Sequence, residues 1–335
     1  MTVGDSVGNK PGHGAAGGLK AAALHVLSVH GLLVFGIALV IVFALLLPAT
    51  FTGSQNFRAI LGNNTTVALL AMAEMIVIAT GNYDLSIAYN VGLMHIVAMG
   101  LLTDAMVPWP LVVILTIAAG GLVGWINGVL VEYAKIDSFI ATLGVGTILY
   151  GFGTWYTNGT QLVGNVPQAF ADLNDARLLT IPLPTYMVAA IAILAWIGLE
   201  HVPIGRQLYA IGSNRKAAEL TGIRARRLVM GAFVCSGLIV GLAGVLLAAR
   251  LQVAQSSVGP EFLLPAFVGA LLGATTVRPG RVNAWGTIIA VLVLAIGIAG
   301  LQQLGNSFFA EPIFQGTALI VSVGLAGYAA RRRKR

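Results

Sequence analysis

The sequence is poor in charged residues, which make up 9% of its 335 positions. Soluble domains usually carry about a quarter. Hydrophobic residues reach 57%. A soluble protein of this length needs far more polar surface than such a composition supplies. The shortage of charge therefore excludes a soluble globular fold and predicts a protein that crosses a membrane several times.

Cysteine is almost absent too, because Cys235 is the single cysteine and lies inside an apolar run. No disulfide can form within the chain, and such a lone cysteine usually packs as a small hydrophobe. The sequence also lacks a GxxxxGK[ST] phosphate loop, an HExxH motif, histidines at metal-ligand spacing and a GxSxG elbow. We therefore expect no enzymatic activity, no metal site and no cofactor in this chain.

The net charge of +7 is concentrated in two places. Five of the 19 basic residues form the terminal RRRKR, and six more lie between Arg206 and Arg227. Basic clusters that flank apolar segments act as orientation signals and suit the anionic lipids of the inner leaflet. The charge therefore indicates contact with membrane lipid and no nucleic-acid partner.

Apolar runs long enough to cross a hydrocarbon core of about 30 Å recur along the sequence. We predict an all-α, polytopic membrane fold with about ten transmembrane helices. They are expected at residues 30–50, 65–81, 86–103, 109–131, 138–157, 184–200, 228–249, 262–277, 284–302 and 312–330.

With both termini in the cytoplasm, 16 of the 19 basic residues lie on the cytoplasmic side, as the positive-inside rule requires. Arg58, Arg177 and Arg250 are the three exceptions. The expected organisation has a mobile, glycine-rich tail, a transmembrane domain with a cytoplasmic loop, and a basic tail. These parts are residues 1–24, residues 25–330 with the loop at 201–227, and residues 331–335.

Glycines repeat at four-residue spacing within several of the expected helices. The repeats are Gly120, Gly124 and Gly128, then Gly237 and Gly241, then Gly269 and Gly273. Small residues at this spacing allow helix backbones to approach closely in lipid. The pattern predicts tight helix packing, and its functional alternative is a helix pair that slides during transport.

Two acidic residues stand close together in otherwise apolar sequence. Glu74 lies within an expected helix, and Asp84 follows in GNYDLS, a polar break between two helices. Broken helices often line a cavity, because irregular backbone within a membrane must be satisfied by protein or water. Glu74 is open to three interpretations: a proton or sodium site, a structural acid bonded to a neighbouring helix, or a contact to a polar substrate.

The stretch GSNRKAAELTGIRARR at residues 212–227 predicts a short surface helix between two apolar segments. Ser213 or Asn214 is a suitable N-cap. Gly222 stands where a left-handed C-terminal cap is needed, and Ile223 can then fold back onto the last turn. A helix of about two turns is only marginally stable alone, so another surface must hold it.

The apolar face of this short helix is small, since it consists of Ala217, Ala218 and Leu220. Such a face is too small for firm anchoring in lipid and is better suited to a groove on a protein. We therefore interpret the helix as a docking element for a cytoplasmic partner, and the alternative is an ordinary connector.

The segment IGRQLYAIGSNRKAAELTGI resembles the cytoplasmic loop of permease subunits of bacterial ABC importers for ribose and related sugars. Further segments resemble the same family in the same order. They are NYDLS at 82–86, DSFIATLG at 137–144, SGLIVGLAGVLLAARLQVAQ at 236–255 and GTIIAVLVLAI at 286–296. The resemblance covers approximately residues 60–325 and is most specific in the loop.

This resemblance implies a multi-pass permease of the bacterial cytoplasmic (inner) membrane. It implies pairing with a second permease, usually an identical copy, docking on an ATPase subunit that holds ATP and Mg²⁺, and delivery of sugar by a periplasmic binding protein. The coupling helix seated in the ATPase would comprise Asn214, Ala217, Ala218, Glu219, Leu220, Thr221 and Gly222.

The substrate route is expected at polar residues inside or between the helices. The candidates are Asp84, Ser86, Asn90, Thr142 and Gln255. The family usually has GG(I/V)DLS where this chain has TGNYDLS, and the larger side chains would reshape a nearby route. The main alternative function is a secondary transporter of a small polar solute, coupled to an ion gradient at Glu74.

Overall fold

The computed structural model describes residues 15–305 and 309–320, and every structural statement below concerns these residues. The longer helices are α1 (Ala15–Leu46), α2 (Ser54–Asn63), α3 (Thr65–Ile78), α4 (Ile87–Thr103), α5 (Trp109–Glu132), α6 (Ser138–Thr157), α8 (Leu183–Trp196), α9 (Pro203–Ser213), α11 (Ala225–Leu251), α12 (Leu263–Gly273) and α13 (Ala284–Gln303). The predicted all-α fold is confirmed.

Short elements complete the described chain. They are α7 (Gln168–Asp175), α10 (Arg215–Leu220), a π-helical turn (Ile197–His201), a 3-10 helix (Ser256–Phe262) and the two-residue strands β1 (Leu162–Val163), β2 (Arg177–Leu178), β3 (Ile181–Pro182) and β4 (Val253–Ala254). Strand β1 pairs with β4, and β2 pairs with β3, both antiparallel. The pairing of β1 with β4 ties the long connection after α6 to the end of α11.

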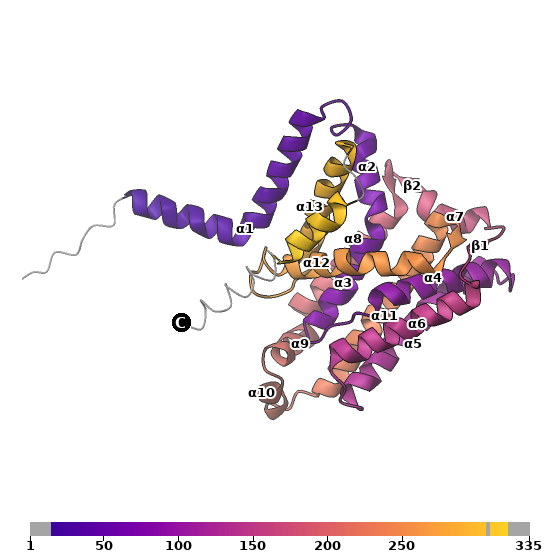
Figure 1. Cartoon of the computed structure of the whole chain (residues 1–335). Coiled ribbons are helices and arrows are strands. Elements are labelled where there is room, and N and C mark those ends of the chain that lie inside the picture. The colour runs from indigo at the N-terminus through magenta and orange to yellow at the C-terminus, as the bar shows by residue number, and fades with distance from the viewer. Residues whose placement is uncertain (1–14, 306–308, 321–335) are drawn as a thin grey trace, which may run out of the picture.

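Helix α11 is the centre of the bundle, because it packs on α5, α3 and α4 (Figure 1). Glycines bring α5 and α11 into backbone contact. A Cβ atom added to Gly120 would lie 2.5 Å from the carbonyl oxygen of Gly237 and 2.8 Å from the Cα of Gly241. Likewise, a Cβ on Gly273 of α12 would lie 2.5 Å from the amide nitrogen of Thr287 on α13. The predicted close packing at these glycines is confirmed.

Five helical segments are long and apolar enough to cross a membrane, and a sixth follows if α2 and α3, bent by 44° at their junction, form one span. A multi-pass membrane protein is therefore confirmed. The count of ten stays a prediction, because α4 and Gly31–Leu46 are apolar but shorter. Residues 310–320 are helical. The rest of the expected last span and the basic tail lie outside the described residues.

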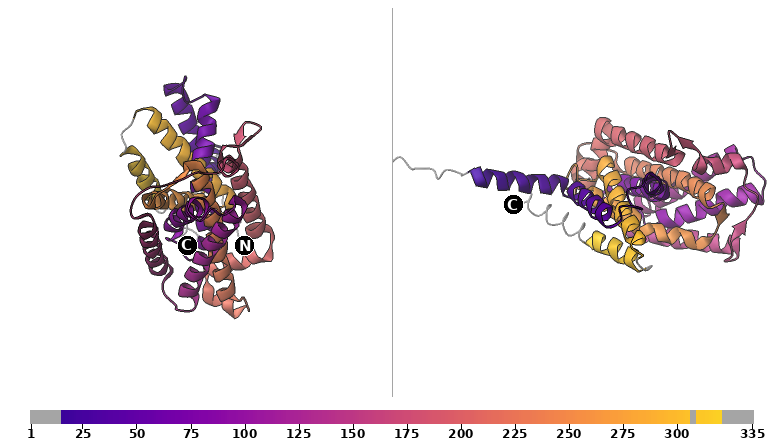
Figure 2. Two further views of the ribbon diagram at one scale, coloured as in Figure 1. Left: turned by 90° about the vertical axis from the view of Figure 1, so that its right-hand side faces the viewer. Right: turned by 90° about the horizontal axis from the view of Figure 1, so that it is seen from above.

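Helix α1 begins at Ala15, so the last ten residues of the expected N-terminal tail, 15–24, are helical. The alanine-rich composition of residues 15–24 explains this helix, since alanine is the strongest helix former, and the mobile tail at 1–24 stays a prediction. Residues 1–14 lie outside the described chain. Helix α1 packs mainly on α13, and its first part projects from the bundle (Figure 2).

The three basic residues expected on the outside come together in space. Arg58, Arg177 and Arg250 all line one cavity of about 500 Å³ beside α2. Helix α2 and helix α10 lie at opposite ends of the molecule (Figure 1). The three exceptions to the charge rule therefore share the end that is remote from the basic loop.

Basic residues expected on the inside gather at the α10 end. Arg278 and Arg281 both form ion pairs with Glu200, just before α9. Lys135 forms an ion pair of 3.6 Å with Glu132 at the end of α5. The fold thus separates the two predicted groups of charge, and the assignment of one end to the cytoplasm stays a prediction.

Candidate functional site

Helix α10 is capped at its N-terminus by Asn214, one of the two expected residues. Its Oδ1 accepts a hydrogen bond of 3.1 Å from the backbone N–H of Ala217, and its own backbone is extended. This is the geometry of an N-cap, which satisfies an N–H group that the first helical turn leaves free. The predicted start of the short helix is confirmed.

The C-terminus of α10 is closed by a left-handed glycine. Gly222 has φ +85°, and its N–H donates to the carbonyl of Glu219 at 3.0 Å. The N–H of Ile223 donates to the carbonyl of Ala218 at 3.3 Å, and the two side chains share a hydrophobic cluster. This pair of bonds with its apolar contact is a Schellman motif. The predicted cap and the folding back of Ile223 are therefore confirmed.

An arginine fastens α10 to the transmembrane bundle. Arg215 donates from Nη1 and Nη2 to the two carboxylate oxygens of Glu132 at 2.7 and 2.6 Å, and from Nε to Glu219 at 3.0 Å. The Glu132 side chain is fully buried at the last turn of α5. Bidentate bonds of this kind are strong and directional, and the bond to Glu132 raises the pKa of Arg215 above its ordinary value.

Glu132 was not among the residues expected from sequence. Its only signal there is a carboxylate at the end of a long apolar segment, directly before YAK. Its partner is 83 positions away, so local pattern does not pair the two. The structure identifies Glu132 as the residue that orients α10 relative to α5.

The apolar face of α10 is divided between two surroundings. Ala218 is buried against Val77, Val229 and other residues of its own chain. Leu220 instead projects into the open, with 89% of its surface exposed, and Ala217 is exposed beside it. The expectation that the three residues form one docking face is therefore wrong for Ala218, because the bundle already covers it. The surface left for a partner consists of Ala217, Leu220 and the exposed end at Thr221 and Gly222.

The segment before α10 touches the break between α3 and α4 directly. A Cβ on Gly81 would lie 3.2 Å from the Cα of Gly212, and a Cβ on Gly212 would lie 3.0 Å from the amide nitrogen of Gly81. Gly81 has φ +81°, which favours glycine. Backbone therefore meets backbone at this point, and a side chain at either position would separate the loop from the break.

A buried polar network fills the break itself. The N–H of Asp84 donates to Glu74 Oε1 and Oε2 at 3.3 and 3.2 Å. Asp84 Oδ1 accepts from the N–H of Ser86 at 3.0 Å, from Ser86 Oγ at 2.6 Å and from Asn127 Nδ2 at 3.2 Å. These four side chains are at most 2% exposed. We use the term buried polar network for six side chains: Glu74, Asp84, Ser86, Asn127, Ser138 and Thr142.

Helix α6 supplies hydroxyl groups to the same break. Thr142 Oγ1 accepts from the N–H of Leu85 at 3.0 Å, and Ser138 Oγ accepts from the N–H of Tyr83 at 3.2 Å. These backbone groups have left the helix and require other partners in a membrane interior. Asn90 lies nearby, with its Nδ2 3.5 Å from the carbonyl of Gly120.

Four of the five expected pathway residues therefore lie together within the protein. Asp84, Ser86, Asn90 and Thr142 are all buried, and each bonds to protein groups. Glu74 accepts from the backbone of the break that follows its own helix rather than from a neighbouring helix, and the choice among its three interpretations stays a prediction. The role of these residues in transport stays a prediction.

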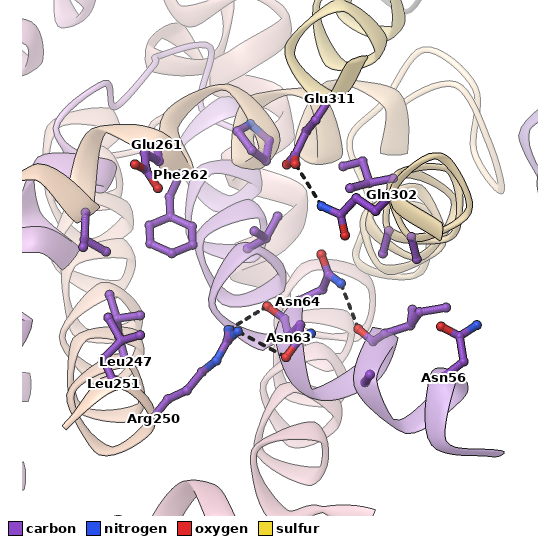
Figure 3. A pocket seen from close by; sticks show the side chains of 18 of the residues that line it. Asn56, Asn63, Asn64, Leu247, Arg250, Leu251, Glu261, Phe262, Gln302 and Glu311 are labelled. Atoms are coloured by element: carbon purple, nitrogen blue, oxygen red, sulfur yellow. Dashed lines mark hydrogen bonds between the residues drawn. The ribbon is translucent and has the colours of Figure 1, made fainter. Parts of the chain in front are cut away.

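Gln255, the fifth expected pathway residue, lies elsewhere and lines a cavity of about 690 Å³. We call this cavity the α2–α13 pocket, because α2 and α13, which meet at the hydrogen bond of Gln303 to Asn56, form one side of it, and the end of α11 lies across from them (Figure 3). Gln255 Oε1 accepts a hydrogen bond of 2.8 Å from Gln161 Nε2. The polar residues that line the α2–α13 pocket are Asn56, Asn63, Asn64, Gln161, Arg250, Gln255, Glu261, Gln302, Gln303 and Glu311.

The polar side chains of this pocket are partly held by one another. Arg250 donates from Nη1 to the carbonyl oxygen of Asn63 at 3.0 Å and from Nη2 to Asn63 Oδ1 at 3.1 Å. Gln302 donates to Glu311 at 3.2 Å (Figure 3). Apolar groups, including Phe262 and Leu247, form the remaining wall. The arrangement combines an apolar wall with fixed hydrogen-bonding groups, which is the usual construction of a small-molecule site.

Residues 56–325 match the family described as "Branched-chain amino acid transport system / permease component". The chain belongs to this family. The protein is therefore a transport permease of the cytoplasmic membrane rather than an enzyme, as the sequence predicts. The matched region contains the buried polar network, α10 and the lining of the α2–α13 pocket.

Curated relatives extend over most of the permease. The ribose import permease of Bacillus subtilis (strain 168) is 31% identical over 86% of this chain and 89% of its own length. The ribose import permease of Haemophilus influenzae (strain Rd) is 29% identical over 89% of this chain and 93% of its own length. The autoinducer 2 import system permease of Escherichia coli (strain SMS-3-5) is 31% identical over 77% of this chain and 79% of its own length. No solved structure matches the permease.

Proposed function

We propose that the permease is the membrane subunit of an ATP-binding-cassette importer for a sugar or related polyol, and that α10 docks it on a separate ATPase subunit. The similarity to ribose import permeases supports the cargo class. The observation that carries the docking role is α10 itself. It is capped at both ends and fastened by Arg215, and it presents an exposed leucine.

The remaining partners follow from the same proposal. ATP and Mg²⁺ bind to the ATPase, a periplasmic binding protein delivers the sugar, and a second copy of the permease completes the membrane part. The chain itself needs no cofactor. Closure of the ATPase on ATP displaces α10, and the permease alternates between two conformations that open to opposite sides of the membrane.

Two contacts lead from α10 into the bundle. The bidentate pair of Arg215 and Glu132 joins α10 to the end of α5, and α5 packs along α11. The backbone contact of Gly212 with Gly81 joins the segment before α10 to the break that holds the buried polar network. A displacement of α10 is thereby passed on to the centre of the bundle.

Co-purification with the ATPase tests the docking role. The tagged permease, expressed with its operon partners, is extracted in mild detergent beside the variants Leu220→Asp and Leu179→Asp. Leu179 is a matched control, because it is 83% exposed and lies in the connection between β2 and β3. We expect ATPase recovery and ATP-driven uptake with the native protein and with Leu179→Asp, and loss of both with Leu220→Asp.

Retention of the ATPase and of uptake by folded Leu220→Asp would contradict the docking role of α10. Uptake by the purified permease alone under a proton or sodium gradient, abolished by Glu74→Ala, would instead support the ion-coupled alternative. The two results are separable, because only the first depends on the ATPase.

A further inference from the structure

We propose that the α2–α13 pocket is a loading site at which the permease itself binds one uncharged, polyhydroxylated molecule of monosaccharide size. The inference rests on the proposed function for the direction of transport and for the cargo class, and it assigns that cargo to particular residues. These residues come from five separate stretches of the chain: α2 and the start of α3, the connection after α6, the stretch from the end of α11 through the 3-10 helix to the start of α12, α13, and Glu311.

The size of the pocket fits such a ligand. Its volume of about 690 Å³ lies within the range of about 300–1,000 Å³ that is typical of small-molecule sites. It exceeds the volume of one monosaccharide and leaves room for bound water, which bridges hydroxyl groups to protein at little cost. The buried polar network offers no comparable space, since its side chains are enclosed and bonded to one another.

The functional groups of the pocket favour hydroxyl groups over ions. Seven of its 22 lining residues are asparagine or glutamine. Each side-chain amide offers both donors and an acceptor, and a sugar hydroxyl does the same, so the two match in either direction. Phe262 provides an aromatic wall against which the C–H face of a sugar ring can pack.

Two of the three charged side chains that line the pocket, Arg250 and Glu311, are engaged with other residues, and Glu261 is the third. Arg250 bonds twice to Asn63, and Glu311 accepts from both Gln302 and Gln315. Arg250 is the one cation among the lining residues, so the carboxylate of a zwitterion such as a branched-chain amino acid would have to draw it away from Asn63, at the cost of leaving the groups of Asn63 unpaired. An uncharged polyol makes no such demand on Arg250, and its hydroxyl groups can exchange for amide bonds such as that of Gln161 with Gln255.

A second cavity adjoins the pocket. The cavity of about 500 Å³ described above shares Ala59, Asn63 and Arg250 with the α2–α13 pocket. Its other lining residues include Asn174 and Arg177 in the connection after α6. A solute therefore reaches the loading site from the end of the molecule opposite to α10, and the Arg250–Asn63 pair stands between the two cavities.

Direct binding to the purified, full-length permease in lipid nanodiscs, without the ATPase, tests the site. The probes are D-ribose, D-glucose and myo-inositol at up to millimolar concentrations, with L-leucine as the competing class, and the readout is titration calorimetry. The variants are Gln255→Leu and Gln302→Leu, which remove an amide of the pocket at nearly constant size. Gln168→Leu is the matched control, because Gln168 is an exposed glutamine on α7 outside the pocket.

We expect saturable binding of at least one polyol, weakened about tenfold in Gln255→Leu and in Gln302→Leu, which corresponds to about 1.4 kcal/mol. Gln168→Leu should bind as the native protein does, and L-leucine should not bind. Two variants in different walls keep the test valid if one of them fails to fold.

Three results would overturn the proposal: no saturable polyol binding, equal affinity in folded pocket variants, or binding of L-leucine in place of the polyols. Recovery of the ATPase through α10 is measured on the same batches. If the ATPase is recovered and the pocket variants change nothing, the loading site is wrong and the importer function stands. If no ATPase is recovered, the importer function itself fails.

Discussion

The buried polar network and the α2–α13 pocket both consist largely of polar side chains. Those of the network are enclosed by protein, whereas those of the pocket line a cavity. In the network, Asp84 alone accepts three hydrogen bonds from neighbouring groups, and every side chain around it is buried. In the pocket, the polar side chains come from distant segments and surround about 690 Å³ of open volume. Polar residues in an apolar chain therefore have two distinct uses, which their sequence surroundings do not separate.

The physical reason for the network lies in the main chain. Between α3 and α4, the N–H groups of Tyr83, Asp84 and Leu85 have no helical partner, and each is satisfied by a side chain from another helix or from α3. An unsatisfied backbone group in a membrane interior costs several kcal/mol. The side chains of the pocket bond mainly to one another, as Gln161 does to Gln255 and Gln302 to Glu311, and they border an open volume in which a ligand can exchange for such bonds.

The largest effect on stability is expected from Asp84→Ala. This change leaves the Ser86 N–H, the Ser86 hydroxyl and the Asn127 amide without their shared acceptor, at about 1–3 kcal/mol for each buried group that finds no other partner. We expect little folded protein, or a strong fall in the temperature of unfolding in detergent. Asp175→Ala, which alters an exposed acid on α7, should have almost no effect.

An Asp84→Ala variant that unfolds at the same temperature as the native protein, but no longer transports, would contradict the structural role given to the buried polar network. It would show that Asp84 acts on the substrate rather than on the fold. Asp84 would then regain the pathway role expected from sequence.

A smaller loss of stability is expected from Gly212→Ala. The added methyl group would overlap the carbonyl oxygen of Ala79 and approach the amide nitrogen of Gly81 to 3.0 Å, and overpacking of this kind typically costs about 1–3 kcal/mol. ATP-driven uptake should fall more than the amount of folded protein, because the contact joins the loop to the break. Gly231→Ala is the control, since that helical glycine has no neighbour within 4 Å and alanine favours helix.

If uptake and the amount of folded protein fall by the same factor in Gly212→Ala, the contact between Gly212 and Gly81 serves stability only and does not couple the loop to the break. The two quantities are measured on the same membranes, by transport and by fluorescence-detected size exclusion.

A moderate effect is expected from Arg215→Lys. Lysine keeps the positive charge but cannot make the two parallel bonds to Glu132, so α10 is held less firmly. We expect reduced ATPase recovery and uptake with nearly native thermal stability. Lys216→Ala, at the exposed neighbouring position, should leave both unchanged. Full coupling in Arg215→Lys would show that charge alone positions α10.

The smallest effect on stability is expected from Gln255→Leu. Its side chain bonds to Gln161 in an exposed pair, so the free energy of unfolding should change by less than about 0.5 kcal/mol. Thermal unfolding of this variant beside Asp84→Ala sharpens the comparison between pocket and network. A large loss of stability in Gln255→Leu would mean that the pocket, like the network, is mainly structural.

The local features of α10 could be predicted because they depend on near neighbours in sequence. Asn214 caps Ala217, and Gly222 with Ile223 closes the last turn, all within a few positions. The glycines at 120 and 237 were also informative, since spacing on one helix face predicts close packing. The burial of Ala218 was missed, because the covering residues belong to α3, α5 and α11.

The sequence by itself determined the helical membrane class, the separation of basic charge between two ends and the caps of α10, because composition, charge and local hydrogen bonding act over short stretches of chain. Only the tertiary structure decided which polar residues bind each other and which face a cavity. Asn127 meets Ser86 across 41 positions, and Arg250 meets Asn63 across 187. Such pairs depend on how the helices pack, and helix packing brings together residues that no local pattern connects.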